Sequence, residues 1–257
     1  MCADMRFQST FARVEKKFVL TAGQADGVIR ALNDHGFREN VFGSPLIQSV
    51  YYDTPDFMLT RRSIERPNYK EKLRMRTYGH PDGTSPAYVE IKKKVNGIVY
   101  KRRTSLPLDQ AVQAVARKRL LPGNGQIGRE IEWFIHSYPG LRPAVLIACE
   151  RRAFENPEEG LRVTFDSGVR YRDRDLDLTH PAEGTCLLPR GEILMEVKVP
   201  GAYPLWMTDL IWKIGAVLTH FSKVGTAYAG HILPAWRESL LLRAGQHSVL
   251  QEVPYSA

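Results

Sequence analysis

Residues 69–78 read YKEKLRMRTY, and the alternation in this stretch decides how the chain folds. Successive side chains of a β-strand point to opposite faces of the sheet, so Leu73 and Met75 share one face. The other face receives four cations and a tyrosine: Lys70, Lys72, Arg74, Arg76 and Tyr78. A sheet built from such strands has an apolar face that needs a cover and a face crowded with positive charge.

The same pattern returns in several other predicted strands. Residues 11–20, FARVEKKFVL, put Arg13, Glu15 and Lys17 on one face. Further charged faces come from residues 88–94, 97–107, 161–166 and 192–198. They contain Glu90, Lys92, Lys94, Lys101, Arg103, Arg162, Asp166, Glu192, Glu196 and Lys198. One such face is ordinary for an antiparallel sheet that meets water. Repeated cations on neighbouring strands repel one another, so the set predicts a polyanionic ligand.

Sparse carboxylates on these faces refine the prediction. Glu15, Glu90 and Glu196 each lie one step from a lysine in the pattern E-x-K. Carboxylates repel phosphate, but Mg²⁺ binds through one or two carboxylates together with phosphate oxygens. Arginine adds a planar fork that binds two phosphate oxygens at once. If the sheet closes with this face inward, it forms a barrel with a charged bore.

The bulk composition is compatible with this interpretation. The chain has 257 residues, a formal net charge of +8, and three widely spaced cysteines. The basic balance favours anionic partners, and the cysteine spacing excludes a disulfide framework. GNGQIG at 123–128 matches a dinucleotide-binding pattern, but a basic helix precedes it instead of a strand. The N-terminus lacks a signal-peptide pattern and no window predicts a membrane span, so we expect a cytoplasmic protein.

The order of elements predicts one α+β domain over residues 1–257. We expect a helix from about 22 to 35 with Thr21 as its cap, and Asn96-Gly97 predicts a hairpin. Other helices are predicted at 108–121, 127–138, 203–219 and 224–243. Further strands are predicted at 46–53, 87–95, 144–153, 161–166, 169–173 and 191–199. The core should span about 11–230, followed by a C-terminal helix and tail over 231–257.

Nine motifs together resemble the catalytic domain of the vacuolar transporter chaperone (VTC) type, within the triphosphate tunnel metalloenzymes. They cover about residues 11–230 in family order. They are RVEKKF (13–18), SVYYDTPD (49–56), YKEKLRMRTYG (69–79), YVEIKKK (88–94), YKRR (100–103), ERRAFE (150–155), LRVTFD (161–166), LMEVKVPG (194–201) and FSKVGTAYAG (221–230).

The resemblance implies an eight-stranded antiparallel β-barrel, a triphosphate tunnel with helices packed outside. It also implies a divalent metal, Mn²⁺ or Mg²⁺, and polyphosphate synthesis from ATP. Matching positions would bind phosphate through Lys17, Arg74, Arg76, Lys92, Lys101, Arg103, Arg151, Arg162, Lys198 and Lys223. Glu196 would hold the metal, with Glu15 and Glu90 as further candidates. Either Lys101 or Arg103 matches the family cation on its strand.

Two departures qualify what the resemblance implies. A related branch opens with E-x-E-x-K, whereas Arg13 stands at the first of these positions, which favours the VTC type. The sequence also contains neither the sensing domain nor the membrane helices of the eukaryotic members, so their regulation is not implied. Three functions stay open: a polyphosphate polymerase, a triphosphatase, and a polyanion-binding module without catalysis. Because acids interrupt the basic face, no stable nucleic-acid partner is expected.

Overall fold

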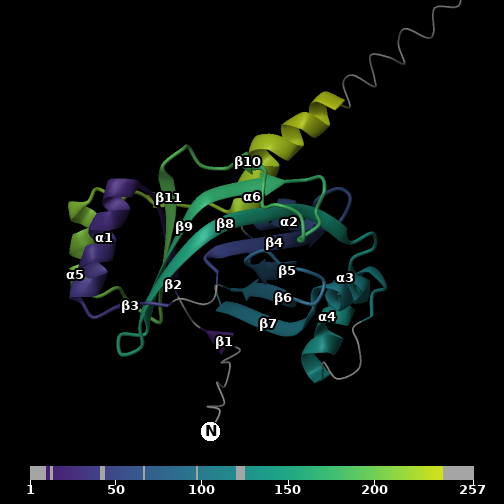
Figure 1. Ribbon diagram of the computed structural model, residues 1–257, viewed down its shortest axis with the longest axis horizontal. Coiled ribbons are helices and arrows are strands. Elements are labelled where there is room, and N and C mark those ends of the chain that lie inside the picture. Colours follow the sequence, from purple (N-terminus) through teal and green to yellow (C-terminus); the bar gives the residue numbers. More distant parts are fainter. Residues whose placement is uncertain are drawn as a thin grey trace, which may run out of the picture.

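Eight long antiparallel strands form the body of the fold in the computed structural model, which describes residues 10–11, 14–40, 44–65, 67–96, 98–119 and 125–239 (Figure 1). They are β2 (Val14–Thr21), β4 (Leu46–Asp53), β5 (Tyr69–Tyr78), β6 (Pro86–Val95), β7 (Ile98–Pro107), β8 (Arg142–Asn156), β9 (Leu161–Arg172) and β11 (Glu192–Val199). Four short strands extend the sheet: β1 (Thr10–Phe11), β3 (Arg38–Glu39), β10 (Thr185–Cys186) and β12 (Leu218–Thr219).

The predicted closed barrel is wrong in one respect, because the sheet is open. It has twelve strands, and its path runs β1-β7-β6-β5-β4-β8-β9-β11-β2-β12, with β3 and β10 attached to its side. Among the described residues, β7 and β2 do not pair with each other, although β1 pairs with β7 just ahead of β2. The sheet nevertheless curls strongly, so that one face is turned inward (Figure 1). We call this the inner face.

Apolar side chains on the outer face form two cores beneath separate pairs of helices. Helices α3 (Leu108–Ala116) and α4 (Gly125–Ser137) cover one core, which includes Leu73, Met75 and Val89. Helices α1 (Ala22–Asp34) and α5 (Leu205–Lys213) cover the other, and Figure 1 shows them beside β2 and β11. The apolar residues that alternate along the strands, as the sequence predicted, therefore form the surface against which the outer helices pack.

The expectation that all helices pack outside is wrong for the C-terminal ones. Helix α6 (Lys223–Ala227) and the π-helix η1 (Tyr228–Ile232) form a third core on the inner face. In β8, Ile147 and Cys149 belong to this inner core, whereas Leu146 and Ala148 belong to the outer one. Part of the inner face is thus apolar and filled by a helix, and the remainder is charged.

Within β9, a bulge separates a part whose inward-facing side chains are charged from a part whose inward-facing side chains are apolar. The sequence predicted two strands, at 161–166 and 169–173, but β9 is continuous and its pairing with β8 shifts register by one residue between Ala148 and Glu150. The extra residue lies near Gly168, whose φ of 56° is left-handed and favours glycine. Beyond the bulge Val169 faces inward, although the same alternation before it turns Phe165 outward.

Local predictions are confirmed where caps and turns control the chain. The Thr21 hydroxyl accepts from the Gln24 backbone N–H, and the Gln24 side chain accepts from the Thr21 N–H, which forms a capping box for α1. Val95 pairs with Ile98, which confirms the hairpin between β6 and β7, while Gly97 itself lies outside the described residues. The unpredicted helix α2 (Met58–Ile64) follows β4. No helix in the described part of the chain is long and apolar enough to cross a membrane.

Not every prediction falls on described residues. Arg13 and residues 240–257 of the predicted C-terminal helix and tail lie outside the described residues. Residues 233–239 continue the helix after η1. The assignment of the chain to one domain stays a prediction.

Candidate functional site

A cluster of charged side chains occupies the part of the inner face that α6 and η1 leave uncovered. Seven of the eight long strands contribute to it, and β4 adds the polar side chains of Ser49 and Tyr51. Its cations are Lys17, Lys72, Arg74, Arg76, Lys92, Lys101, Arg103, Arg151, Arg162, Lys198 and Lys223. Its carboxylates are Glu15, Glu90, Asp166 and Glu196. We call these fifteen residues the inner-face cluster.

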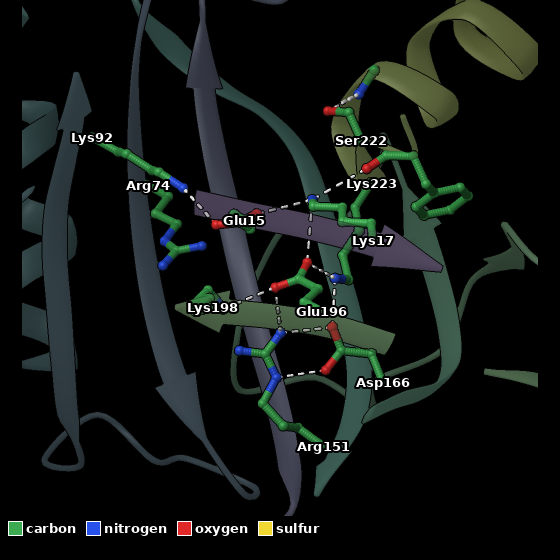
Figure 2. A network of polar contacts seen from close by, with 12 residues as sticks. Glu15, Lys17, Arg74, Lys92, Arg151, Asp166, Glu196, Lys198, Ser222 and Lys223 are labelled. Atoms are coloured by element: carbon green, nitrogen blue, oxygen red, sulfur yellow. Dashed lines mark hydrogen bonds and ion pairs between the residues drawn. The ribbon is translucent and has the colours of Figure 1, made fainter. Parts of the chain in front are cut away.

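Glu196 lies at the centre of one group of contacts, shown in Figure 2. Its carboxylate oxygens are 3.1 Å from Lys198 Nζ and 3.2 Å from Lys17 Nζ. The same carboxylate is 3.4 Å from Lys223 Nζ and 4.0 Å from Arg151 Nη2. One buried glutamate therefore faces four cations that come from three strands and from α6.

Asp166 was not predicted as a site residue, yet it holds two of these cations. Arg151 donates through Nε and Nη2 to the two carboxylate oxygens, at 2.5 and 2.6 Å. Lys223 Nζ donates to the same carboxylate at 2.5 Å, and the aspartate is fully buried. Its alternation with Arg162 along β9 was the available sequence signal. Asp166 fixes the direction of Arg151 and Lys223, so it acts as a positioning residue.

Glu90 forms a second group with the cations of β5 and β7. Its oxygens are 2.6 Å from Arg74 Nε, 2.7 Å from Lys101 Nζ and 3.4 Å from Arg103 Nε. The Arg103 guanidinium also lies 3.5 Å from the centre of the Tyr88 ring. Both Lys101 and Arg103 therefore reach the same carboxylate, so geometry does not separate the two candidates for the family cation.

Three cations of the cluster have no carboxylate partner among the described residues. Arg76 Nε donates to the hydroxyl of Ser49 at 3.0 Å. Arg162 lies between Lys198 of β11 and Glu155 of β8 in the ladders of the sheet. No ion pair joins its guanidinium, or the ammonium of Lys72, to a carboxylate among the described residues. These are the side chains best able to accept an external anion.

Two strands near opposite ends of the sheet path, β2 and β6, approach each other through side chains. Glu15 Oε2 on β2 lies 3.7 Å from Lys92 Nζ on β6, although those strands are far apart in the sheet order (Figure 2). Glu15 is also 3.5 Å from Lys17 Nζ. Within the described residues, one ion pair therefore links the two sides of the seam, where β2 and β7 share no backbone ladder.

The carboxylates of the cluster are ionised, although Glu90, Asp166 and Glu196 are buried. Burial raises the pKa of Glu196, but the charges of Lys223, Lys198, Lys17 and Arg151 outweigh it and hold the pKa well below its usual range. The same balance depresses the pKa of Glu90, chiefly through Arg74 and Lys101. Eleven cations against four ionised carboxylates leave seven net positive charges, which is nearly the whole net charge of the chain.

The motif SVYYDTPD contributes side chains both to the inner face and to the start of helix α2. Ser49 and Tyr51 face the cluster, and the Tyr51 hydroxyl accepts from Arg74 Nη1 at 3.3 Å. Asp53 instead accepts from the backbone N–H groups of Leu59 and Thr60 at 2.9 Å and so holds the first turn of α2. The pattern of this motif therefore reflects both an inner face and a helix start.

The metal site stays a prediction, and Glu15 and Glu196 are the pair of candidate carboxylates whose geometry is compatible with it. Glu15 and Glu196 both contact the ammonium of Lys17, so two carboxylates approach one cation position. This donor set fits a divalent ion that takes its remaining ligands from phosphate oxygens and water. Glu90 belongs to the other group and already faces three cations. Within the described ranges, no three His, Cys, Asp or Glu side chains gather as a metal cage.

Comparison with solved structures agrees with the class of fold that this geometry defines, a curled antiparallel sheet around a charged interior. A putative adenylate cyclase from Bacillus halodurans superposes with a TM-score of 0.50, over 84% of this chain and 96% of that one. The two sequences are 13% identical, so the likeness concerns the fold alone.

Sequence comparison gives the family. The model of the VTC domain family matches residues 12–231, and the chain belongs to that family. Vacuolar transporter chaperone complex subunit 4 of Trypanosoma brucei brucei and of Trypanosoma cruzi are each 28% identical to it, over 54% of this chain. The match covers 21% of each of those proteins, so this chain is similar to about a fifth of their length.

Proposed function

We propose that the inner-face cluster binds a triphosphate and carries out metal-dependent phosphoryl transfer, with polyphosphate synthesis from ATP as the favoured reaction. The observation that carries this proposal is the surplus of seven positive charges within the inner-face cluster. A triphosphate group supplies several negative charges in a short chain. Membership of the VTC domain family supports a phosphate-chain substrate.

The roles of the residues follow from their partners. Arg76 and Arg162 have guanidinium groups that no carboxylate occupies in the described chain, so they are the first contacts for phosphate oxygens. Arg74 and Arg151 are held in place by Glu90 and Asp166, so their unused N–H groups point in fixed directions. Preorganised donors stabilise charge that develops during transfer without having to rearrange.

The lysines supply charge that can shift between partners. Lys17 and Lys198 contact Glu196 through single ammonium groups, and Lys92 contacts Glu15 at 3.7 Å. A bound phosphate chain competes for these ammonium groups, because phosphate oxygens are acceptors of higher charge. A divalent ion held by Glu196 and Glu15 would neutralise charge on the transferred group when bound. Phosphoryl transfer needs little more than such positioning and neutralisation.

The acceptor decides between the three candidate functions. If the end of a phosphate chain receives the phosphoryl group, the protein is a polymerase, and if water receives it, the protein is a triphosphatase. A cluster that binds without turnover is a polyanion-binding module. The substrate ATP is also the reason why we propose a cytoplasmic location.

One experiment separates the three functions. The purified protein is incubated with ATP and Mn²⁺, and the products are separated on a gel stained for polyphosphate. A ladder identifies a polymerase, free phosphate alone a triphosphatase, and unchanged ATP a binding module. Arg76→Ala should abolish either product, whereas Lys213→Met on the exposed end of α5 should retain it. A product that persists in the Arg76 variant would come from a contaminant or from another site.

A further inference from the structure

Three lysines lie side by side across neighbouring strands of the inner face. In the ladders of the sheet, Lys72 of β5 is opposite Lys92 of β6, and Lys92 is opposite Lys101 of β7. Directly opposite residues on antiparallel strands have Cβ atoms about 5 Å apart, and like charges there destabilise the sheet. We call these three residues the lysine row. Such a row costs folding free energy unless its charges are matched.

Two members of the lysine row have carboxylate partners and the third has none. Lys101 is 2.7 Å from Glu90, and Lys92 is 3.7 Å from Glu15. Lys72 is half-buried, and no carboxylate contacts it among the described residues. Its charged neighbours are the lysines Lys92, Lys17 and Lys70, and its polar neighbour is the hydroxyl of Tyr51.

We propose that Lys72 is a further phosphate-contacting residue. It lies two residues before Arg74 on the same face of β5 and contacts the bound anion there. The inference rests on the proposed function, because an anion on the inner face is the partner that Lys72 lacks. Side chains two residues apart on a strand are about 6.6 Å apart along it. Lys72 thus extends the phosphate site beyond the arginines, toward Lys92 and the seam of the sheet. Its ligand is a phosphate oxygen of the triphosphate itself or of a longer chain.

The titration of Lys72 provides a signature of this role. Burial lowers its pKa to about 8, and the charges of Lys92, Lys17 and Lys70 act in the same direction. The ammonium is therefore charged below that pH and neutral above it, so anion binding near pH 8 should take up a proton. On β4, Tyr51 has a pKa of about 8, because Arg74, Arg76 and Lys72 outweigh its burial.

Other titrating groups of the inner face are present in every variant. The pKa values of Lys198 and Lys101 are lowered by burial, and those of Glu15 and Glu90 are lowered by the surrounding cations. The anion also has its own titration. Because these groups are present in every variant of residue 72, a difference between such variants reports Lys72 together with its effect on the pKa of Tyr51.

The test is calorimetric titration of the full chain with tripolyphosphate and, separately, with long-chain polyphosphate, in the presence of EDTA. Wild type, Lys72→Met, Lys72→Arg and the surface control Lys213→Met are compared at about pH 6.5 and about pH 9.5, on either side of the lysine pKa. We expect Lys72→Met to bind about tenfold or more weakly at the lower pH, as for the loss of a charge-assisted contact. At the higher pH it should match wild type, and Lys72→Arg should bind well at both.

Stability gives a second readout that guards against misfolding. Without anion, Lys72→Met should melt at a higher temperature than wild type at neutral pH, because it removes an uncompensated charge. Weakening for both anions places Lys72 on the triphosphate, and weakening for the long chain alone places it on the chain beyond. If Lys72→Met binds both anions as wild type does at the lower pH, the inference is overturned. If wild type binds neither anion, the proposed function itself fails.

Discussion

Replacing Glu196 by glutamine removes the negative charge that faces four cations of the inner face. Lys17 keeps Glu15 and the carbonyl of Phe221 as acceptors after this change. Arg151 and Lys223 keep Asp166. Lys198 loses the one carboxylate that pairs with it among the described residues, at 3.1 Å. The substitution therefore breaks about one buried ion pair, although Glu196 contacts four cations.

The size of the effect follows from that count. Removing one partner of a buried ion pair costs about 3–5 kcal/mol, because the remaining charge is left uncompensated. The Lys198 side chain is 24% exposed, so water offsets part of this cost. We expect the free energy of unfolding without anion to fall by about 3 kcal/mol. The released Lys198 is then available to phosphate, and a charge-assisted contact contributes about 1.5–3 kcal/mol, so tripolyphosphate should bind about 10- to 100-fold more tightly.

Three measurements on the same variant check the prediction. Urea unfolding gives the loss of stability, titration with tripolyphosphate in EDTA gives the gain in affinity, and ATP turnover with Mn²⁺ gives the activity. Turnover should nearly vanish although the site becomes more positive, because the metal loses its main carboxylate. The matched control is Glu39→Gln, which breaks the exposed pair with Arg152 at 2.8 Å. That change should cost less than about 1 kcal/mol and leave turnover intact.

Opposite results would refute separate parts of the reasoning. If Glu196→Gln turns over ATP at the wild-type rate with Mn²⁺, Glu196 is not the metal ligand. If its affinity for tripolyphosphate without metal is unchanged, Lys198 does not meet phosphate. A loss of stability no larger than that of Glu39→Gln would show that Glu196 is not the hub of the ion-pair group.

The remaining predictions concern phosphate binding, acid stability and the bulge. Arg74→Ala and Arg76→Ala should each weaken tripolyphosphate binding by about 1.5–3 kcal/mol in calorimetric titration, and unchanged affinity in both would exclude a phosphate site on the inner face. Because Asp166 and Glu196 have depressed pKa values in the folded protein, stability should be constant between about pH 5 and about pH 7 and fall as the pH drops below their unfolded values near 4. Denaturant melts across this range measure it, and a flat profile to pH 2 would contradict the assigned ion pairs. Gly168→Ala should lower the free energy of unfolding by about 1–2 kcal/mol through its left-handed φ alone, since an added Cβ meets only the end of Arg170 at 3.8 Å; a neutral result in urea melts would show that the bulge does not need glycine.

Alternation in the sequence was sufficient to predict the strands and the two faces of most of them. In β5, apolar Leu73 and Met75 were assigned to a covered face and Arg74 and Arg76 to the opposite one, and both assignments are confirmed by burial and contacts. This works because a strand has a period of two residues, which short-range sequence displays directly. The cap at Thr21 is equally local.

Features that depend on distant segments were beyond the sequence. The placement of α6 on the inner face depends on a match between its apolar side chains and those of β8 and β9, which no single segment displays. The role of Asp166 depends on Arg151 and Lys223, which arrive from another strand and from α6.

The sequence by itself determined the chemistry of the inner face, because each strand carries its own alternation of charged and apolar residues. The tertiary structure decided whether the sheet closes and which charges meet. Closure depends on how far the sheet curls and on whether its last strands align. In the described part of the chain, Glu15 and Lys92 bridge the seam and no backbone ladder joins β2 to β7. The bulge at Gly168 was likewise decided by the tertiary structure. Its extra residue turns the side chains that follow it to the opposite face of the sheet, and this shift is defined only by the pairing of β9 with β8.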